Sequence, residues 1–162
     1  MTVGVPIDAV IVDAMSVAIG QAREAAVAGE VPVGAVVLHH GQLIVRAQNR
    51  MRRDHDATSH AELLAVRGAA AQLGERHLAE CTLVVTLEPC AMCAGAIVLS
   101  RIHALVFGAW DDKAGMCGSV ADIVRHPRLN HRPQVLGGVQ QDECARLLTD
   151  FFASRRASEV VP

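Results

Sequence analysis

A short apolar strand runs directly into a helix at residues 82–100, which read TLVVTLEPCAMCAGAIVLS. The run TLVVTL is apolar and partly β-branched, which is typical of a short buried strand. The following AMCAGAIVLS is rich in small residues that a helix accepts readily. A buried strand followed at once by a helix indicates an α/β fold, in which helices connect parallel strands.

The same alternation extends along most of the chain. Helices are predicted at 8–28, 60–73, 91–100 and 143–156, with a short helical stretch at 119–125 inside a loop. Strands are predicted at 33–38, 43–47, 82–87, 102–109 and 133–137, the first two forming a hairpin around His-His-Gly-Gln. This order predicts an α/β sandwich with a mixed sheet, in which one antiparallel pair is followed by parallel strands.

The composition predicts a single domain at 1–162. The 162 residues are 51% apolar and only 2% aromatic, so the core must be large and mostly aliphatic. No apolar run is long enough to span a bilayer and no secretory signal is recognisable, so we expect no membrane association and a cytoplasmic location. Five cysteines argue against a disulfide scaffold. Cys81, Cys117 and Cys144 are isolated and are predicted to be buried or half-buried free thiols.

The charges give no strong indication of a partner. A net charge of −2 does not by itself suggest a nucleic-acid ligand. Basic side chains nevertheless gather in three segments, at 46–55, 125–132 and 155–156. A local basic segment can bind phosphate whatever the global charge. On charge alone, however, we interpret these three basic segments as solvated surface.

Cys90 and Cys93 form a C-x-x-C motif at the start of the helix that follows the strand at 82–87. Their spacing places both thiols on one face of the helix, and the helix N-terminus favours their thiolate form. Such a motif is compatible with a redox dithiol, with half of a structural zinc knuckle, or with two ligands of a catalytic metal. The motif alone does not separate these alternatives.

The segment His60-Ala61-Glu62 favours the catalytic metal. It too lies where a loop enters a helix, and His60 would be a third ligand. Three protein ligands leave a tetrahedral zinc with one open position for water, as in catalytic sites. Glu62, which would not bind the ion, is placed to carry protons to and from that water. The combined H-x-E…P-C-x-x-C pattern is the signature of zinc nucleobase deaminases.

Beyond this pattern, the chain resembles bacterial tRNA-specific adenosine deaminases over a core of about residues 8–157. The juxtaposition of TLEPCAMCAGA and HPRLNHR favours this branch over cytosine or guanine deaminases. Ser59 stands where the family often has alanine. The matching stretches are VPVGAVV (31–37), QNR (48–50), HDATSHAE (55–62), TLEPCAMCAGA (86–96), SRI (100–102), VFGA (106–109), HPRLNHR (126–132) and DECARLLTDFF (142–152).

The resemblance implies a three-layer α/β/α sandwich on a mixed five-stranded sheet, the cytidine-deaminase-like fold. It implies a homodimer with one Zn²⁺ per subunit, which holds a tRNA anticodon stem-loop with both subunits. The implied reaction is hydrolytic deamination of adenosine to inosine at the wobble position. The alternative is a free-base or nucleoside deaminase, acting on guanine or cytosine, with the same fold.

The resemblance also assigns roles to individual residues. His60, Cys90 and Cys93 are the implied zinc ligands and Glu62 the proton shuttle. Asn49, which from its position alone would be a turn residue at a strand end, is an implied contact to the purine edge. The other seven histidines have no comparable partner in sequence and are interpreted as surface or RNA-facing residues. The remaining implied substrate contacts are Val33, Ala61, Leu87, Asp111, Lys113, Phe152, Arg155 and Arg156.

Overall fold

Five strands form one mixed sheet in the order β2-β1-β3-β4-β5 in the computed structural model, which describes residues 5–159. The strands are β1 (Gly34–His39), β2 (Gln42–Gln48), β3 (Cys81–Leu87), β4 (Ala104–Ala109) and β5 (Gln134–Gly137). The helices are α1 (Ala9–Val27), α2 (Ala61–Leu73), α3 (Ala91–Leu99) and α4 (Gln141–Glu159). Every strand and long helix expected from the sequence is therefore present, with ends shifted by a few residues.

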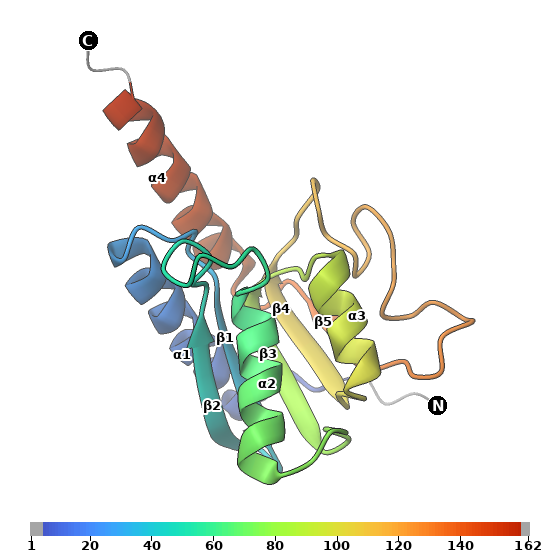
Figure 1. Cartoon of the computed structure of the whole chain (residues 1–162). Helices are drawn as coiled ribbons and strands as arrows, with labels where there is room; N and C mark the ends of the chain where they lie inside the picture. The colour runs from blue at the N-terminus through green and yellow to red at the C-terminus, as the bar shows by residue number, and fades with distance from the viewer. Residues whose placement is uncertain (1–4, 160–162) are drawn as a thin grey trace.

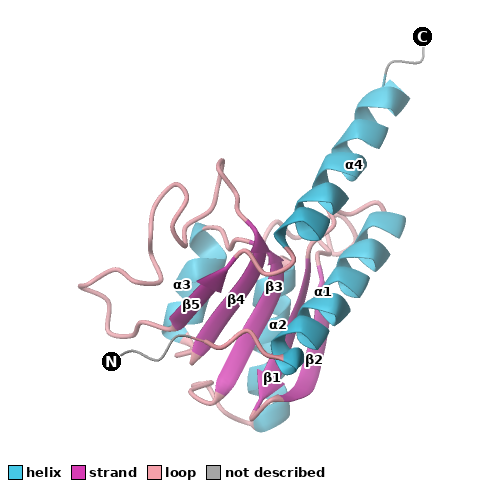
Figure 2. Ribbon diagram, turned by 180° about the vertical axis from the view of Figure 1, so that it is seen from behind, coloured by secondary structure: helices cyan, strands magenta, loops and turns pink. Residues whose placement is uncertain are grey.

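The helices cover both faces of the sheet and make three layers. Helices α2 and α3 lie on the face seen in Figure 1, and α1 and α4 lie on the face seen from behind in Figure 2. The end of α4 extends beyond the body of the molecule (Figure 1). This arrangement confirms the three-layer α/β/α sandwich on a mixed five-stranded sheet.

Side chains alternate between two apolar cores, as the period of a strand requires. In β1, Ala35 and Val37 pack into the core beneath α2 and α3, whereas Val36 and Leu38 pack into the core beneath α1. The only aromatic side chain that is fully buried among the described residues is Phe107 in β4. The cores are mostly aliphatic, as the composition predicted. Cys81, Cys117 and Cys144 are buried free thiols, which confirms that prediction.

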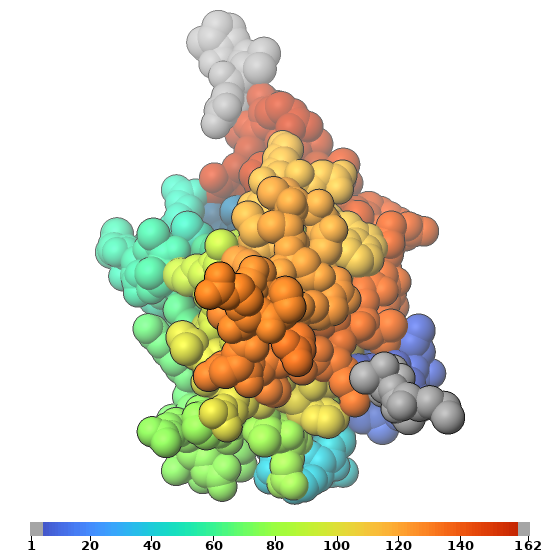
Figure 3. All heavy atoms as spheres, turned by 90° about the vertical axis from the view of Figure 1, so that its right-hand side faces the viewer, coloured from blue at the N-terminus to red at the C-terminus, as the bar shows by residue number. Residues whose placement is uncertain are grey.

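Two details of the prediction were wrong. The sheet has two antiparallel pairs rather than one, because β3 pairs with the far edge of β1 and not with β2. The hairpin strand β1 is thus inserted into an otherwise parallel sheet. The segment 119–125 contains turns and an isolated bridge between Cys117 and Asp122 instead of a helix. It belongs to the long β4–β5 connection, which spreads over the face of the molecule in Figure 3.

Gly34 is the point where β1 approaches α1 most closely. A Cβ atom there would collide with the Ala18 carbonyl oxygen and the Ala22 amide nitrogen, both of which are backbone atoms that cannot turn aside. We expect Gly34→Ala to lower the free energy of unfolding by about 3 kcal/mol or more, measured by denaturant unfolding. Gly20→Ala is the matched control, because nothing lies within 4 Å of the added atom. Within helix α1 this control should be stabilised by about 0.5–1 kcal/mol.

Candidate active site

Two helix N-termini converge beside the end of β3. His60 is the N-cap residue of α2 and Cys90 is the N-cap residue of α3. Neither side chain caps its own helix, so both are free to point at a shared centre. The His60 Nδ1 atom lies 3.6 Å from Cys90 Sγ and 3.6 Å from Cys93 Sγ. The structure therefore brings together the three residues that were predicted as ligands, with their donor atoms within 4.8 Å of one another.

This donor set fits a zinc ion in both geometry and chemistry. With Zn–N bonds of about 2.0–2.1 Å and Zn–S bonds of about 2.3 Å, a tetrahedral ion separates its N and S ligands by about 3.6 Å. One imidazole and two thiolates also match the preference of zinc for nitrogen and sulfur donors. Hydrogen bonds with Cys93 and His60 lower the pKa of Cys90 to about 3, whereas the same contact raises the pKa of Cys93, whose proton a bound zinc would displace. The three residues form a ready-made tridentate site.

Glu62 lies in the first turn of α2, two residues after His60, and is 4% exposed. Burial disfavours its charged form and raises its pKa to about 7. A carboxyl group with such a pKa can both accept and release a proton near neutrality. Its position in the cavity described next makes it a candidate acid–base group.

A cavity of about 210 Å³ opens at this centre. Val31, Met51, Glu88 and Ala114 also line it and were not predicted from the sequence. Met51 directly follows the QNR stretch and Glu88 lies within TLEPC, so the matching motifs held a signal for both. The predicted residues that line the cavity are Val33, Asn49, His60, Ala61, Glu62, Leu87, Cys90 and Asp111.

Asn49 lines this cavity and carries a buried acceptor that is unused. The side chain is 4% exposed, and its Nδ2 donates to the Val31 carbonyl oxygen at 3.3 Å. Among the described residues, its Oδ1 has no hydrogen-bond partner. The amide orientation follows from Val31, whose carbonyl can only accept. A buried, unpaired acceptor is costly, so it indicates a ligand donor at this position. Asn49 directly follows the end of β2, as its position in the sequence indicated.

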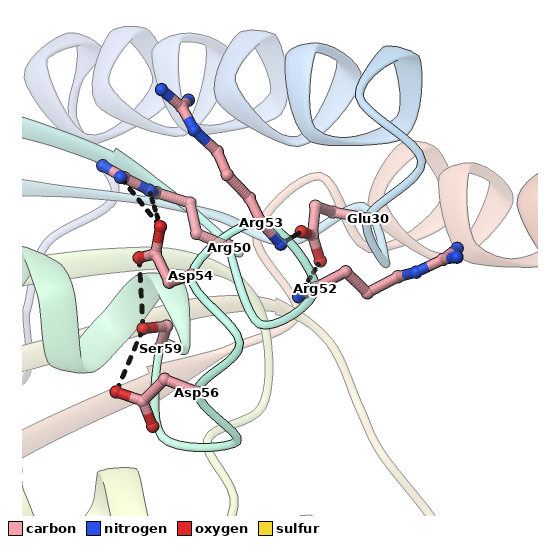
Figure 4. Close-up of polar contacts among 7 residues, drawn as sticks. All are labelled: Glu30, Arg50, Arg52, Arg53, Asp54, Asp56 and Ser59. Carbon is pink, nitrogen blue, oxygen red and sulfur yellow. Dashed lines mark hydrogen bonds and ion pairs between the residues drawn. The ribbon is translucent and has the colours of Figure 1, made fainter.

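The loop before His60 is held by buried and partly buried carboxylates, as Figure 4 shows. Glu30 is 2% exposed and accepts the backbone N–H groups of Arg52 and Arg53 at 3.1 and 2.7 Å. The Ser59 hydroxyl lies 3.3 Å from Asp54 and 3.4 Å from Asp56. Alanine at position 59 could make neither contact. These bonds fix the chain immediately before the first ligand.

A second buried carboxylate, Glu88, fixes the loop on the other side of the cavity. It accepts the backbone N–H groups of Asp111, Cys117 and Ser119 at 2.9, 3.0 and 3.0 Å, and also the Ser119 hydroxyl. Burial alone would raise the pKa of Glu88, but these donors outweigh it and lower the pKa. The segment 119–125 is not helical because its N–H groups find other acceptors: Ile123 donates to the Met116 carbonyl oxygen and Arg125 to Asp122 Oδ1, not to the carbonyls four residues earlier. The matching motif marked the position of Glu88, but nothing in the sequence indicated that its side chain would anchor this loop.

Four predicted substrate contacts do not line the cavity. Lys113 and Arg156 are exposed, and Phe152 is 44% exposed on α4. Arg155 donates from Nη2 to the Gly29 carbonyl oxygen at 2.6 Å and lies 4.7 Å from the centre of the Phe151 ring. Arg155 thus ties α4 to the loop after α1. Any contact that these four residues make with a substrate lies outside the cavity.

Comparison with known proteins agrees with this geometry. A sequence model of the MafB19-like deaminase family matches residues 11–156. A Bacillus subtilis (strain 168) protein named tRNA-specific adenosine deaminase is 44% identical over 142 residues, 88% of each chain. A Deinococcus deserti protein named tRNA(Ile)-lysidine synthase is 50% identical over 155 residues. That match covers 95% of this chain but only 29% of the length of the relative.

Solved structures show the same likeness. One solved structure superposes on this chain with a TM-score of 0.81. It comes from biochemical and structural studies of A-to-I editing by tRNA:A34 deaminases at the wobble position of transfer RNA. It is 41% identical, and the match covers 84% of this chain and 99% of that one. Between residues 5 and 159, no helix combines the length and apolarity of a membrane span.

Proposed function

We propose that this chain, which belongs to the deaminase family that includes the tRNA-specific adenosine deaminases, converts adenosine to inosine at the wobble position of a tRNA anticodon. The observation that carries the proposal is that His60, Cys90 and Cys93 converge beside a cavity that Glu62 and Asn49 also line. We assign the first three residues as ligands of one Zn²⁺. Bound there, zinc would supply an activated water by lowering its pKa toward neutrality.

Glu62 is the residue we assign to proton transfer. It takes a proton from the attacking water and delivers it to N1 of adenine as the water oxygen adds to C6. It then takes the remaining proton from the oxygen added at C6 and gives it to the C6 amine, which leaves as ammonia, so that water and adenosine become inosine and ammonia. Its burial and its raised pKa of about 7 support both halves of this cycle.

The cavity walls would hold the base. Val33, Ala61 and Leu87 offer an apolar surface for a purine ring, and Asn49 Oδ1 accepts a hydrogen bond from a donor of the nucleoside. An anticodon loop is single-stranded, so only about a few kcal/mol or less is needed to bring the base out of its stack. Asp111 lies at the rim, where it would meet the flanking nucleotide or the sugar.

Asn49→Ala should weaken this recognition without disturbing the metal. Removing the buried amide is expected to lower kcat/KM for tRNA by about 10–100-fold, the usual cost of about 1–3 kcal/mol for a lost buried polar contact. The measurement is inosine formation at limiting tRNA, with zinc content determined on the same sample. Gln72→Ala, an exposed amide near the end of α2, is the control and should be unaffected. Unchanged kcat/KM in Asn49→Ala would remove this residue from the site.

The proposal also covers the assembly. We propose that the chain acts as one deaminase domain within a cytoplasmic homodimer, in which both subunits hold the anticodon stem-loop. The three basic segments and the exposed Lys113, Phe152 and Arg156 would meet the phosphates and bases outside the cavity. A contact between the two subunits would cover Leu99, an apolar side chain that is 77% exposed at the other end of α3 from Cys90. Light scattering on the purified protein should give twice the chain mass.

Incubation with total tRNA tests the function directly. Sequencing should show A-to-G changes at the first anticodon position of a specific tRNA, since inosine is copied as guanosine. Parallel reactions test the alternative of a small-molecule deaminase. They contain free adenine, guanine, cytosine or adenosine as the substrate, and ammonia release is measured. Rapid ammonia release from a free base, with no editing of tRNA, would overturn the proposal.

A further inference from the structure

A second group of metal-ligand residues lies at the opposite end of the sheet from the cavity. His39 ends β1, His40 begins the turn to β2, and Glu80 directly precedes β3. In the sheet, His39 pairs with Cys81, the first residue of β3, whereas the cavity lies beyond Leu87 at the other end of that strand. At about 3.3 Å per residue, the two places are about 20 Å apart.

The turn conformation brings two consecutive imidazoles to the same side. Neighbouring side chains of a strand normally point to opposite faces. His40, however, has a φ of 48°, in the left-handed region, and Gly41 follows with a φ of 75°. The two rings therefore lie side by side, with their centroids 4.2 Å apart. A left-handed conformation at a residue other than glycine is uncommon, although histidine tolerates it better than most.

Glu80 completes a three-donor cluster. Its Oε2 atom lies 2.9 Å from His40 Nε2 and 3.8 Å from His39 Nε2, and the donor atoms of all three residues lie within 4.8 Å of one another. The backbone holds both sides in place, since His40 N–H donates to the Glu80 carbonyl oxygen at 3.4 Å. The side chains are 30%, 62% and 66% exposed, so water and ions reach them freely.

A simple surface ion pair accounts for only part of this arrangement. It explains the contact of His40 with Glu80 but leaves the His39 ring without a hydrogen bond among residues 5–159. Two neutral imidazoles and one carboxylate oxygen are ligands that divalent transition metals bind well. We propose that His39, His40 and Glu80 form a second binding site for a divalent transition-metal ion such as Zn²⁺, separate from the candidate active site.

Such an ion would cross-link the β1–β2 turn to the start of β3. Because its three protein donors are exposed to water, this site should bind the metal ion more weakly than the buried site does. The ion should therefore exchange with the medium. An ion that binds only the folded chain raises its stability in proportion to the logarithm of its concentration. The second site is therefore expected to make thermal unfolding dependent on free zinc even when the first site is full.

Equilibrium dialysis of the full chain against buffered micromolar Zn²⁺ tests the proposal. The wild type should hold about two zinc ions per chain, and His40→Asn and Glu80→Gln should hold about one, or need at least tenfold more zinc for the second. Asparagine suits the left-handed turn and glutamine is isosteric, so both variants should fold. His55→Asn is the matched control, because His55 is also exposed with a φ of 50°.

Cys90→Ser separates this site from the first one. It should keep one zinc under the same dialysis, and the double variant with His40→Asn should keep none. The occupancy of the second site does not depend on deaminase activity, because the experiment measures bound zinc and not turnover. A wild type that never exceeds one zinc, or a second zinc that His40→Asn and Glu80→Gln bind as tightly as the wild type, overturns the proposal.

Discussion

Glu62→Ala is expected to lower kcat for inosine formation by at least about 10³-fold while the variant still binds zinc. The general acid–base group typically contributes about 10²–10⁴-fold, and here the same carboxyl group acts at both ends of the reaction. Zinc should remain because the three candidate ligands, His60, Cys90 and Cys93, are untouched. The measurement is single-turnover editing of tRNA, with zinc content determined on the same preparation.

Two further variants separate chemistry from folding. Glu62→Gln keeps the shape of the buried side chain and removes only its ability to exchange protons, so it should be as inactive as Glu62→Ala. Glu24→Gln alters an exposed carboxylate on α1 and should behave as the wild type. Activity within tenfold of the wild type in Glu62→Gln would show that another group moves the proton.

The parts of the structure that were predictable depend on local signals. His60 and Cys90 each follow a loop and begin a helix, and the structure places both as N-cap residues. The helix predicted at 60–73 ends there, at Gly74, whose φ of 69° suits a glycine at a helix C-terminus. Alternation in β1 divides its side chains between two cores, as a period of two requires. Each of these features is set by a short run of consecutive residues.

The parts that were missed depend on contacts between distant residues. Glu88 accepts a hydrogen bond from the backbone N–H of Ser119, which lies 31 residues further along the chain. No local pattern marks a glutamate that will accept three backbone N–H groups. Glu80 meets His40 only because β1 pairs with β3, which was itself missed when a single antiparallel pair was predicted. The histidines at 39 and 40 therefore looked like ordinary surface residues in the sequence.

Cys90→Ser is expected to abolish both tight zinc binding and editing. A serine hydroxyl has no accessible anionic form near neutrality, whereas the Cys90 pKa is lowered to about 3. Two protein ligands hold zinc far less tightly than three, so less than about a tenth of the protein should retain the ion after desalting into metal-free buffer. Under these conditions the exposed cluster at His40 also releases its zinc, so the residual metal reports the buried site.

Cys144→Ala is the matched control for the loss of a thiol. Cys144 is buried on the other face of the sheet, with its Sγ 3.9 Å from Met15 Sδ, and belongs to no metal-ligand group among the described residues. This variant should keep one tightly bound zinc and its activity. It isolates the coordination role of Cys90 from the general effect of removing a buried sulfur. A Cys90→Ser protein that retains stoichiometric zinc after desalting would contradict the ligand assignment, because His60, Cys90 and Cys93 are the described residues that form a metal-ligand group at this cavity.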